Sequence, residues 1–334
     1  MKKVRTPDYN YNFDLSTGHF ERWGKTIEDD PTYSPLGPEI LDIEISTICS
    51  QGCKFCYKKN TSVGENMSLE TFKRLFFKFP SNLTQIAFGI GSIEANPDLF
   101  EIMWYCRNNG IIPNVTINGY GMNPWIYDKL VEVCGAVAVS LYDYDTCFGA
   151  VHELSKRGLK QVNIHCLLAN STQDKCFNAL FLKESDKRLE GLNAIVYLRL
   201  KPKGRGIGLT QIKEDSYKTL INYALRRNIP IGFDSCSAPL FAEVIKDRSD
   251  ASEIMKYVEP CESCCFSYYI NVKGIGYPCS FSEGVDGYKG TDVLNCNDFM
   301  KDIWFGDETL RFRTSILNNI DSNGCRNCPL YSFK

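Results

Sequence analysis

The chain has 334 residues and a formal net charge of −2 at neutral pH, and 43% of its residues are hydrophobic. This length allows a large buried core, so we expect one major domain with a smaller one beside it. A net charge this close to zero gives no long-range attraction for nucleic acid, so we expect no nucleic-acid partner. The sequence shows neither a secretion signal nor a run of about 18 apolar residues, so we expect a cytoplasmic protein without membrane partners.

The first 40 residues form an extension rich in Tyr, Phe and Pro. Within it, segments 11–14 and 19–23 flank the turn residues of 16–18, which predicts a β-hairpin. We expect residues 1–40 to be a separate N-terminal extension that covers one end of the domain that follows.

From residue 41 onward, apolar strand-like segments alternate with helical segments. The expected buried parallel strands are 41–47, 85–91, 112–119, 136–142, 161–168 and 194–201. The helical segments between them include 68–79, 97–109, 124–134, 146–157 and 211–227. Six units are too few for an eight-stranded barrel of about 250 residues. We therefore expect an α/β fold, a partial (β/α)6 TIM barrel over residues 41–235, with its chemistry at the carboxyl ends of the strands.

Three cysteines directly follow the first of these strands. Cys49, Cys53 and Cys56 have the spacing C-x3-C-x2-C, with Phe55 before the last thiol. A loop of this kind can supply three thiolates to a [4Fe–4S] cluster and leave the fourth iron open, whereas electron-transfer clusters use four thiolates. A structural zinc site needs a fourth Cys or His nearby, and none follows before Cys106. Zinc binding and unligated core thiols are the alternatives.

This motif resembles the radical SAM superfamily. The resemblance implies that the open iron binds the amino and carboxylate groups of S-adenosylmethionine (SAM) and donates the electron that cleaves SAM to a 5′-deoxyadenosyl radical. It also implies the partial barrel as the core fold and a flavodoxin- or ferredoxin-type protein as the reductant.

Several strand ends match SAM-binding elements of this superfamily. The segment 88–94 lies where the family has a Gly-Gly-Glu motif, but Ile90 separates the glycines and Glu94 is displaced. The resemblance therefore assigns contacts with the SAM amino group to the backbone of Gly89 and Gly91, which allow close approach. The further candidates for cofactor binding are Phe55, Asn118, Ser140, Asn163 and Arg199.

Arg199 is a charge within an apolar strand, so we expect it to pair with a carboxylate or to meet an anionic group of SAM or of the substrate. His165 alternates with Asn163 on the fifth strand, where a histidine is more often a core residue. The segment 201–206, Lys-Pro-Lys-Gly-Arg-Gly, predicts a basic loop over the mouth of the barrel.

Half of the sixteen cysteines lie at or after Cys236. The spacing Gly274-x4-Cys279 and the terminal Cys-x2-Cys pair resemble the SPASM and twitch extensions of radical SAM enzymes, and a twitch domain holds one auxiliary [4Fe–4S] cluster. The resemblance implies a small domain over residues 236–334. Its expected cluster ligands are Cys261, Cys279, Cys325 and Cys328, with Cys264 or Cys265 as alternatives to Cys261. Zinc is the alternative metal, because Cys-x2-Cys pairs also form zinc knuckles.

Asp234 and Cys236 follow the apolar segment 231–233 and would lie on one face if that strand continues. Burial as a small hydrophobe is one interpretation of Cys236. The other is a catalytic pair, in which Asp234 binds a polar group of the substrate and Cys236 supplies a hydrogen atom or ligates iron.

These features predict a radical SAM enzyme that abstracts hydrogen from its substrate. Twitch and SPASM extensions most often accompany peptide modification, such as crosslinking, epimerisation or oxidation. Ser280 stands where sulfatase-type maturases have an Asp base, which argues against that reaction. The alternatives are a dehydrogenase of a small molecule and, outside enzymes, an iron–sulfur electron carrier or a zinc scaffold.

Overall fold

A ten-stranded sheet is the largest element of the computed structural model, which describes residues 1–331. Seven of its strands are parallel and neighbour one another in the order of the chain. They are β4 (Ile40–Glu44), β5 (Gln85–Gly89), β6 (Ile112–Ile117), β7 (Ala136–Ser140), β8 (Gln161–Leu168), β9 (Ala194–Arg199) and β10 (Ile231–Phe233). Sequential parallel strands are the arrangement of a barrel wall.

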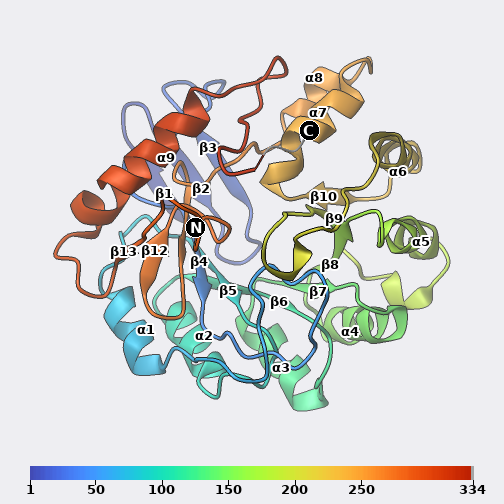
Figure 1. Ribbon diagram of the computed structural model, residues 1–334, viewed down its shortest axis with the longest axis horizontal. Helices are drawn as coiled ribbons and strands as arrows, with labels where there is room; N and C mark the ends of the chain where they lie inside the picture. The colour runs from blue at the N-terminus through green and yellow to red at the C-terminus, as the bar shows by residue number, and fades with distance from the viewer. Residues whose placement is uncertain (332–334) are drawn as a thin grey trace.

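One helix follows each of the strands β4 to β9, and Figure 1 shows these helices in an arc outside the strands. They are α1 (Leu69–Phe76), α2 (Leu99–Asn108), α3 (Pro124–Val133), α4 (Tyr144–Lys156), α5 (Gln173–Lys183) and α6 (Glu214–Arg226). The structure therefore confirms the α/β class and the six βα units of the predicted partial barrel. The short strand β10 extends the wall by one further strand.

Side-chain caps explain where several helices begin. Ser68, Asn123 and Asp143 each accept a hydrogen bond from the backbone N–H three residues later, at the starts of α1, α3 and α4. Such caps satisfy donors that have no partner inside the helix. The cap at Asp143 places the start of α4 before the predicted residue 146.

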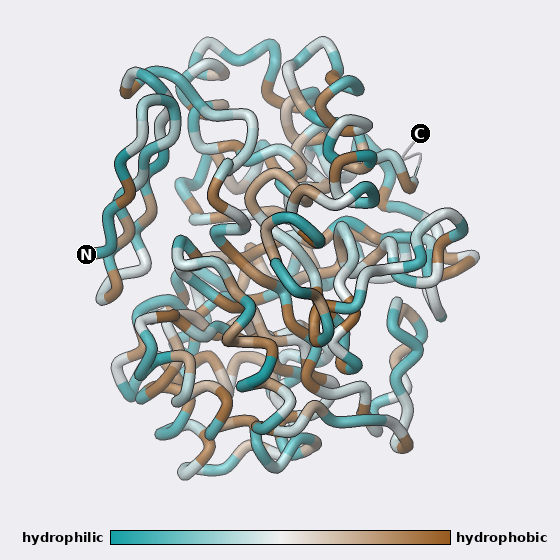
Figure 2. Tube along the Cα trace, turned by 90° about the vertical axis from the view of Figure 1, so that its left-hand side faces the viewer, coloured by the Kyte–Doolittle hydropathy of each residue, from teal (hydrophilic) through white to brown (hydrophobic). Residues whose placement is uncertain are grey.

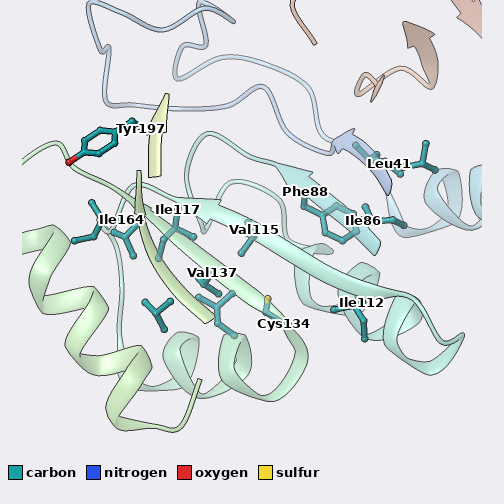
Figure 3. Packing of buried hydrophobic residues seen from close by; sticks show 14 of the residues in the cluster. Leu41, Ile86, Phe88, Ile112, Val115, Ile117, Cys134, Val137, Ile164 and Tyr197 are labelled. Carbon is teal, nitrogen blue, oxygen red and sulfur yellow. The ribbon is translucent and has the colours of Figure 1, made fainter. Parts of the chain in front are cut away.

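The core lies between the parallel strands and the outer helices. On β8, Val162, Ile164, Cys166 and Leu168 are buried, while the alternate side chains are partly exposed. This alternation separates an outer face, packed on α4 and α5, from an inner face directed into the barrel. Figure 3 shows strand residues of this core, among them Ile164 and Val137.

The N-terminal residues form an antiparallel sheet of β1 (Lys2–Arg5), β2 (Asn10–Phe13) and β3 (Phe20–Trp23), with a β2–β3 hairpin where the sequence predicts one. Figure 2 shows it along one side of the molecule. The Tyr11 hydroxyl donates to the Asn82 carbonyl, and the Gln161 side chain donates to the Thr17 carbonyl, both at 2.7 Å. Because Asn82 and Gln161 lie at the amino ends of barrel strands, this sheet covers the end opposite to the expected chemistry.

The residues after β10 return to the same sheet. Strand β11 (Ser267–Ile270) pairs with β4 in parallel, and β12 (Ile275–Tyr277) and β13 (Thr291–Asp292) continue the sheet antiparallel. The other elements of this part are α7 (Ala238–Ile245), α8 (Ala251–Met255), the π-helix Phe299–Trp304 and α9 (Asp307–Leu317). The boundary between residues 235 and 236 stays a prediction, and β11 extends the barrel sheet across it.

No helix within residues 1–331 has the length and apolar character that crossing a bilayer requires.

Candidate active site

A cavity of about 530 Å³ lies at the carboxyl ends of the barrel strands. The last residues of β4, β5, β7 and β9 all line it, together with the cysteine loop that follows β4. Ser280 and Phe281, which follow Cys279, line it from the C-terminal part of the chain. The cavity therefore lies between the two cysteine-rich regions of the sequence.

Cys49, Cys53 and Cys56 all line this cavity and are partly exposed. Their loop is held by backbone hydrogen bonds from Cys49 N–H to the Thr61 carbonyl at 2.7 Å and from Cys56 N–H to the Cys53 carbonyl at 3.2 Å. Burial raises the pKa of the Cys53 thiol, and a hydrogen bond with Tyr142 opposes that shift. The predicted three thiols are thus directed into one space.

No three Cys, His, Asp or Glu side chains within residues 1–331 are close enough to bind a single metal ion. A [4Fe–4S] cluster does not require such close approach, because its thiolates bind separate irons. Three thiols on one loop, facing a cavity, match the donor set of a cluster with one open iron.

Gly91 lies against the cysteine loop. A Cβ atom at this position would lie 2.2 Å from the Ile48 carbonyl oxygen and 2.5 Å from the Cys49 Cβ. Only glycine permits this approach of the β5 end to the loop. Gly89 also lines the cavity, so both glycines of the imperfect motif lie where the sequence places them.

Arg205 is a site residue that sequence reasoning missed. Its side chain donates to the Cys53 carbonyl at 2.8 Å and to the Asn60 carbonyl at 3.1 Å, and its backbone N–H donates to the Cys56 carbonyl. The neighbouring Gly204, with a φ of +63°, packs against the carbonyls of Cys56 and Tyr57. The basic segment 201–206 therefore fixes the cysteine loop. The one signal of this role in the sequence is the position of the segment at the end of the predicted strand 194–201.

The predicted cofactor-binding residues are not all at the cavity. Phe55, Asn118, Ser140 and Arg199 line it together with the glycines, whereas Asn163 does not. The Asn163 side chain accepts a hydrogen bond from Asn193 at 2.9 Å. Asn163 lies two residues nearer the amino end of β8 than His165, where its hydrogen bond with Asn193 is exposed, so it is at the end of the barrel away from the cavity.

Asn118 has a positioning role. Its side-chain amide donates to the Gly91 carbonyl at 3.0 Å and accepts from the Tyr120 N–H at 2.9 Å. It therefore connects the ends of β5 and β6 beside the cysteine loop.

His165 lines the cavity, although a core role was the expected one. Its Nδ1 lies 3.5 Å from the Thr116 hydroxyl, and burial lowers its pKa to about 4. The imidazole is therefore neutral at pH 7 and offers a hydrogen bond rather than a charge to a molecule in the cavity.

Asp234 lines the cavity, but the assumed strand geometry of the Asp234–Cys236 pair is wrong. Strand β10 ends at Phe233, and residues 235–237 form a 3-10 turn instead. The Asp234 carboxylate pairs with Lys201 and accepts from the Ser237 hydroxyl at 2.6 Å. Cys236 does not line the cavity, and its carbonyl accepts a hydrogen bond from Arg199 at 3.4 Å.

Lys58 joins the two sides of the cavity. Its ammonium group lies 3.1 Å from a Glu44 carboxylate oxygen, donates to the Tyr269 hydroxyl at 2.7 Å, and pairs with Glu283. Burial raises the pKa of Glu44, and the positive charge of Lys58 opposes that shift. The contacts of Lys58 therefore connect β4 and the cysteine loop with β11 and the segment after Cys279.

Asp42 is a carboxylate on the cavity wall that the sequence analysis did not single out. It faces Tyr269 across the β4–β11 pairing, and it has no hydrogen-bond or ion-pair partner among the described residues. Enclosure by the barrel raises its pKa to about 6. A ligand that enters the cavity therefore meets one unpaired acidic group.

The C-terminal cysteines differ in their surroundings. All sixteen cysteines of the chain are free thiols. Cys264 and Cys265 are fully buried, and Cys325 is buried in an apolar cluster with Ala238 and Ala242. Cys106, Cys134, Cys166 and Cys176, which lie in or beside barrel strands and helices, are also buried.

Comparison with known proteins finds neither a family model nor a curated protein that matches the sequence. Solved structures do match. Streptococcus suis SuiB bound to S-adenosylmethionine has a TM-score of 0.65 at 16% identity, covering 84% of this chain and 68% of its own. SuiB bound to the precursor peptide SuiA has a TM-score of 0.64 at 16% identity, covering 82% and 66%. Native anSMEcpe with bound AdoMet and Cp18Cys peptide has a TM-score of 0.62 at 16% identity, covering 82% of each chain. The chain thus shares the fold of SuiB and anSMEcpe.

Proposed function

We propose that this chain is a radical SAM enzyme that modifies a peptide. The observation that carries the proposal is the placement of Cys49, Cys53 and Cys56 on one loop facing the cavity at the carboxyl ends of the barrel strands. A bound [4Fe–4S] cluster would supply the electron that cleaves SAM, and the resulting 5′-deoxyadenosyl radical would take a hydrogen atom from the substrate. A flavodoxin- or ferredoxin-type protein is the proposed reductant.

The residues around the thiols have roles that follow from their contacts. Gly89 and Gly91 offer backbone groups at the end of β5, and Ser140 offers a hydroxyl at the end of β7, for the polar groups of SAM. Arg205 and Asn118 hold the cysteine loop and Gly91 in place. Arg199 stays a proposed partner for an anionic group of SAM or of the substrate.

The peptide substrate is proposed from the neighbours in fold: SuiB binds S-adenosylmethionine in one structure and the precursor peptide SuiA in another, and anSMEcpe holds AdoMet and a peptide together. The reaction can be a crosslink, an epimerisation or an oxidation. The chain's part is to place one C–H bond of the peptide beside SAM and to exclude water. The polar wall of Asp42, Glu44 and Lys58 is the proposed place for polar groups of that substrate.

The test replaces Cys49, Cys53 and Cys56 together by Ala. We expect the loss of one cluster, about four irons per chain, and of 5′-deoxyadenosine formation from SAM under dithionite, because these thiolates are the cluster's ligands. Iron analysis and chromatography of the nucleoside measure both effects. Cys134→Ala is the control, since it removes a buried thiol away from the cavity. Undiminished 5′-deoxyadenosine formation by the triple variant would refute the proposal.

A further inference from the structure

The basic segment 201–206 contacts two loops that lie far apart in the sequence. Lys201, Lys203 and Arg205 alternate along it, and each side chain reaches a different part of the chain. Lys201 pairs with Asp234, which follows β10. The other two cations hold backbone carbonyls rather than carboxylates, so each of them fixes the course of a loop.

Arg205 holds the cysteine loop by its carbonyls. Its Nε donates to the Cys53 carbonyl at 2.8 Å, and both of its terminal nitrogens donate to the Asn60 carbonyl at 3.1 Å. Its backbone N–H donates to the Cys56 carbonyl at 3.0 Å. One residue therefore fixes three carbonyls of the loop that carries the three thiols, and two of those carbonyls belong to the cysteines themselves.

Lys203 holds the segment after Cys279 in the same way. Its ammonium group donates to the carbonyls of Ser280 at 3.1 Å, Phe281 at 3.2 Å and Glu283 at 2.5 Å. An ammonium group has three N–H donors, so these bonds use all of them. Lys203 is not among the described residues that line the cavity. Its effect on a reaction in the cavity must therefore pass through the groups that it holds.

The two loops also meet each other at this point. The rings of Tyr57 and Phe281 pack with their centroids 4.5 Å apart. A Cβ atom at Gly204 would lie 2.3 Å from the Tyr57 carbonyl oxygen, and the φ of +63° at this residue favours glycine. The backbone between Lys203 and Arg205 thus lies directly against the cysteine loop. Because one residue separates the two cations, a shift of Lys203 also shifts Arg205.

We propose that Lys203 is a positioning residue for SAM cleavage, which ties the cysteine loop, through Gly204 and Arg205, to the segment after Cys279. The C-terminal part of the chain then keeps the three thiols ordered, although the hydrogen bonds of the Lys203 ammonium go to that part and not to the loop. The role of Arg205 follows from its direct contacts, whereas that of Lys203 depends on coupling between the two loops. The inference rests on the proposed function for the reaction, and on these contacts alone for the coupling.

The experiment compares Lys203→Met with the unmodified chain after anaerobic reconstitution. Methionine keeps an apolar stem and removes the three donors. The matched control is Lys78→Met, because Lys78 also connects the barrel with the C-terminal part through a carbonyl, that of Cys296 at 2.8 Å, but does so after α1 and not beside the cysteine loop. Hydrogen–deuterium exchange in residues 49–61 measures the order of the loop. Exchange in α3 shows whether the barrel stays folded, and 5′-deoxyadenosine formation under dithionite measures the reaction.

We expect Lys203→Met to speed exchange in residues 49–61 about tenfold and to slow 5′-deoxyadenosine formation about tenfold, because the thiols are then held less closely in the geometry that catalysis requires. Exchange in α3 should stay unchanged, and Lys78→Met should change none of the three measurements. Lys203→Arg, which keeps several N–H donors, should restore part of both effects. Added to Arg205→Gln, Lys203→Met should have little further effect, because both changes act on the same loop.

Unchanged exchange in residues 49–61 of Lys203→Met would overturn the inference, and so would equally fast exchange in α3 or an equal effect of Lys78→Met. A full additional loss when Lys203→Met is added to Arg205→Gln would also overturn it, since the two residues would then act separately. Faster exchange with undiminished 5′-deoxyadenosine formation would show that this order of the loop does not serve the reaction. Failure of the proposed function is a separate result, in which the unmodified chain forms no 5′-deoxyadenosine while exchange still reports the coupling.

Discussion

At the scale of single residues, the absence of a side chain at Gly91 decides where the cysteine loop can lie. The β5 end approaches Ile48 and Cys49 so closely that one methyl group would overlap both of them. The position of Cys49 therefore depends on the residue at the end of the next strand as well as on its own loop.

We predict that Gly91→Ala displaces the Cys49 segment and lowers the rate of 5′-deoxyadenosine formation about 100-fold, because a shift of about 1 Å is enough to spoil catalytic geometry. Nucleoside release under dithionite, together with iron content, measures the effect. Gly149→Ala is the matched control, since Gly149 lies in α4 with no atom near its added methyl group, and the change should stabilise the helix by about 0.5–1 kcal/mol. Equal activity of the two variants would show that the contact with Cys49 is unimportant.

At the scale of elements, a buried ion pair between Arg22 and Glu39 adds to the hydrogen bonds that hold the N-terminal sheet to the barrel. Arg22 on β3 donates to the Glu39 carboxylate at 3.0 Å, and the Tyr9 hydroxyl donates to its other oxygen at 2.6 Å. The Arg22 guanidinium also lies 3.5 Å from the ring centroid of Phe266 at the start of β11. Glu39 therefore connects the extension, β4 and β11.

We predict that Glu39→Ala lowers the free energy of unfolding by about 2 kcal/mol, because the Tyr9 hydroxyl loses its buried acceptor and Arg22 is left with the more exposed Asp30 and Glu259. Chemical denaturation monitored by circular dichroism measures this difference. Glu21→Ala, on an exposed position of β3, is the control and should change the unfolding free energy by less than about 0.5 kcal/mol. A Glu39→Ala chain as stable as the control would mean that the contacts of Glu39 do not stabilise the fold.

Some of these elements and site residues can be predicted from the sequence, and others cannot. The six βα units follow from apolar periodicity, and Cys49, Cys53 and Cys56 from their spacing, because both signals are local. The roles of Arg205, Lys58 and Asp42 depend on segments far apart in the chain, which only the fold brings together. Spacing also predicts Cys325 as a ligand, and this role stays a prediction, with the thiol placed beside Ala238 and Ala242 of α7.

At the scale of the whole molecule, the cavity has walls from both the barrel and the C-terminal segment, and Lys58 links the two. Its partners are Glu44 on β4, Tyr269 on β11 and Glu283 after Cys279. The Glu44 side chain is only 6% exposed, so its charge depends on this partner. The relative position of the two cysteine-rich regions depends on the same contacts.

We predict that Lys58→Met lowers the free energy of unfolding by about 3 kcal/mol at pH 8, since it leaves the buried Glu44 carboxylate without its cation. Burial already raises the pKa of Glu44 above 4.5, and removal of Lys58 raises it further. In this variant Glu44 has a lower pKa in the unfolded chain than in the folded one, so ionisation favours the unfolded chain. The loss of stability therefore grows as pH rises through the folded pKa and shrinks as pH falls toward 4.5. Denaturation curves at pH 5 and pH 8 measure the effect, with the exposed Lys54→Met in the same loop as the control. A loss of stability that is the same at both pH values would show that Lys58 acts through packing of its stem and not through the charge of Glu44.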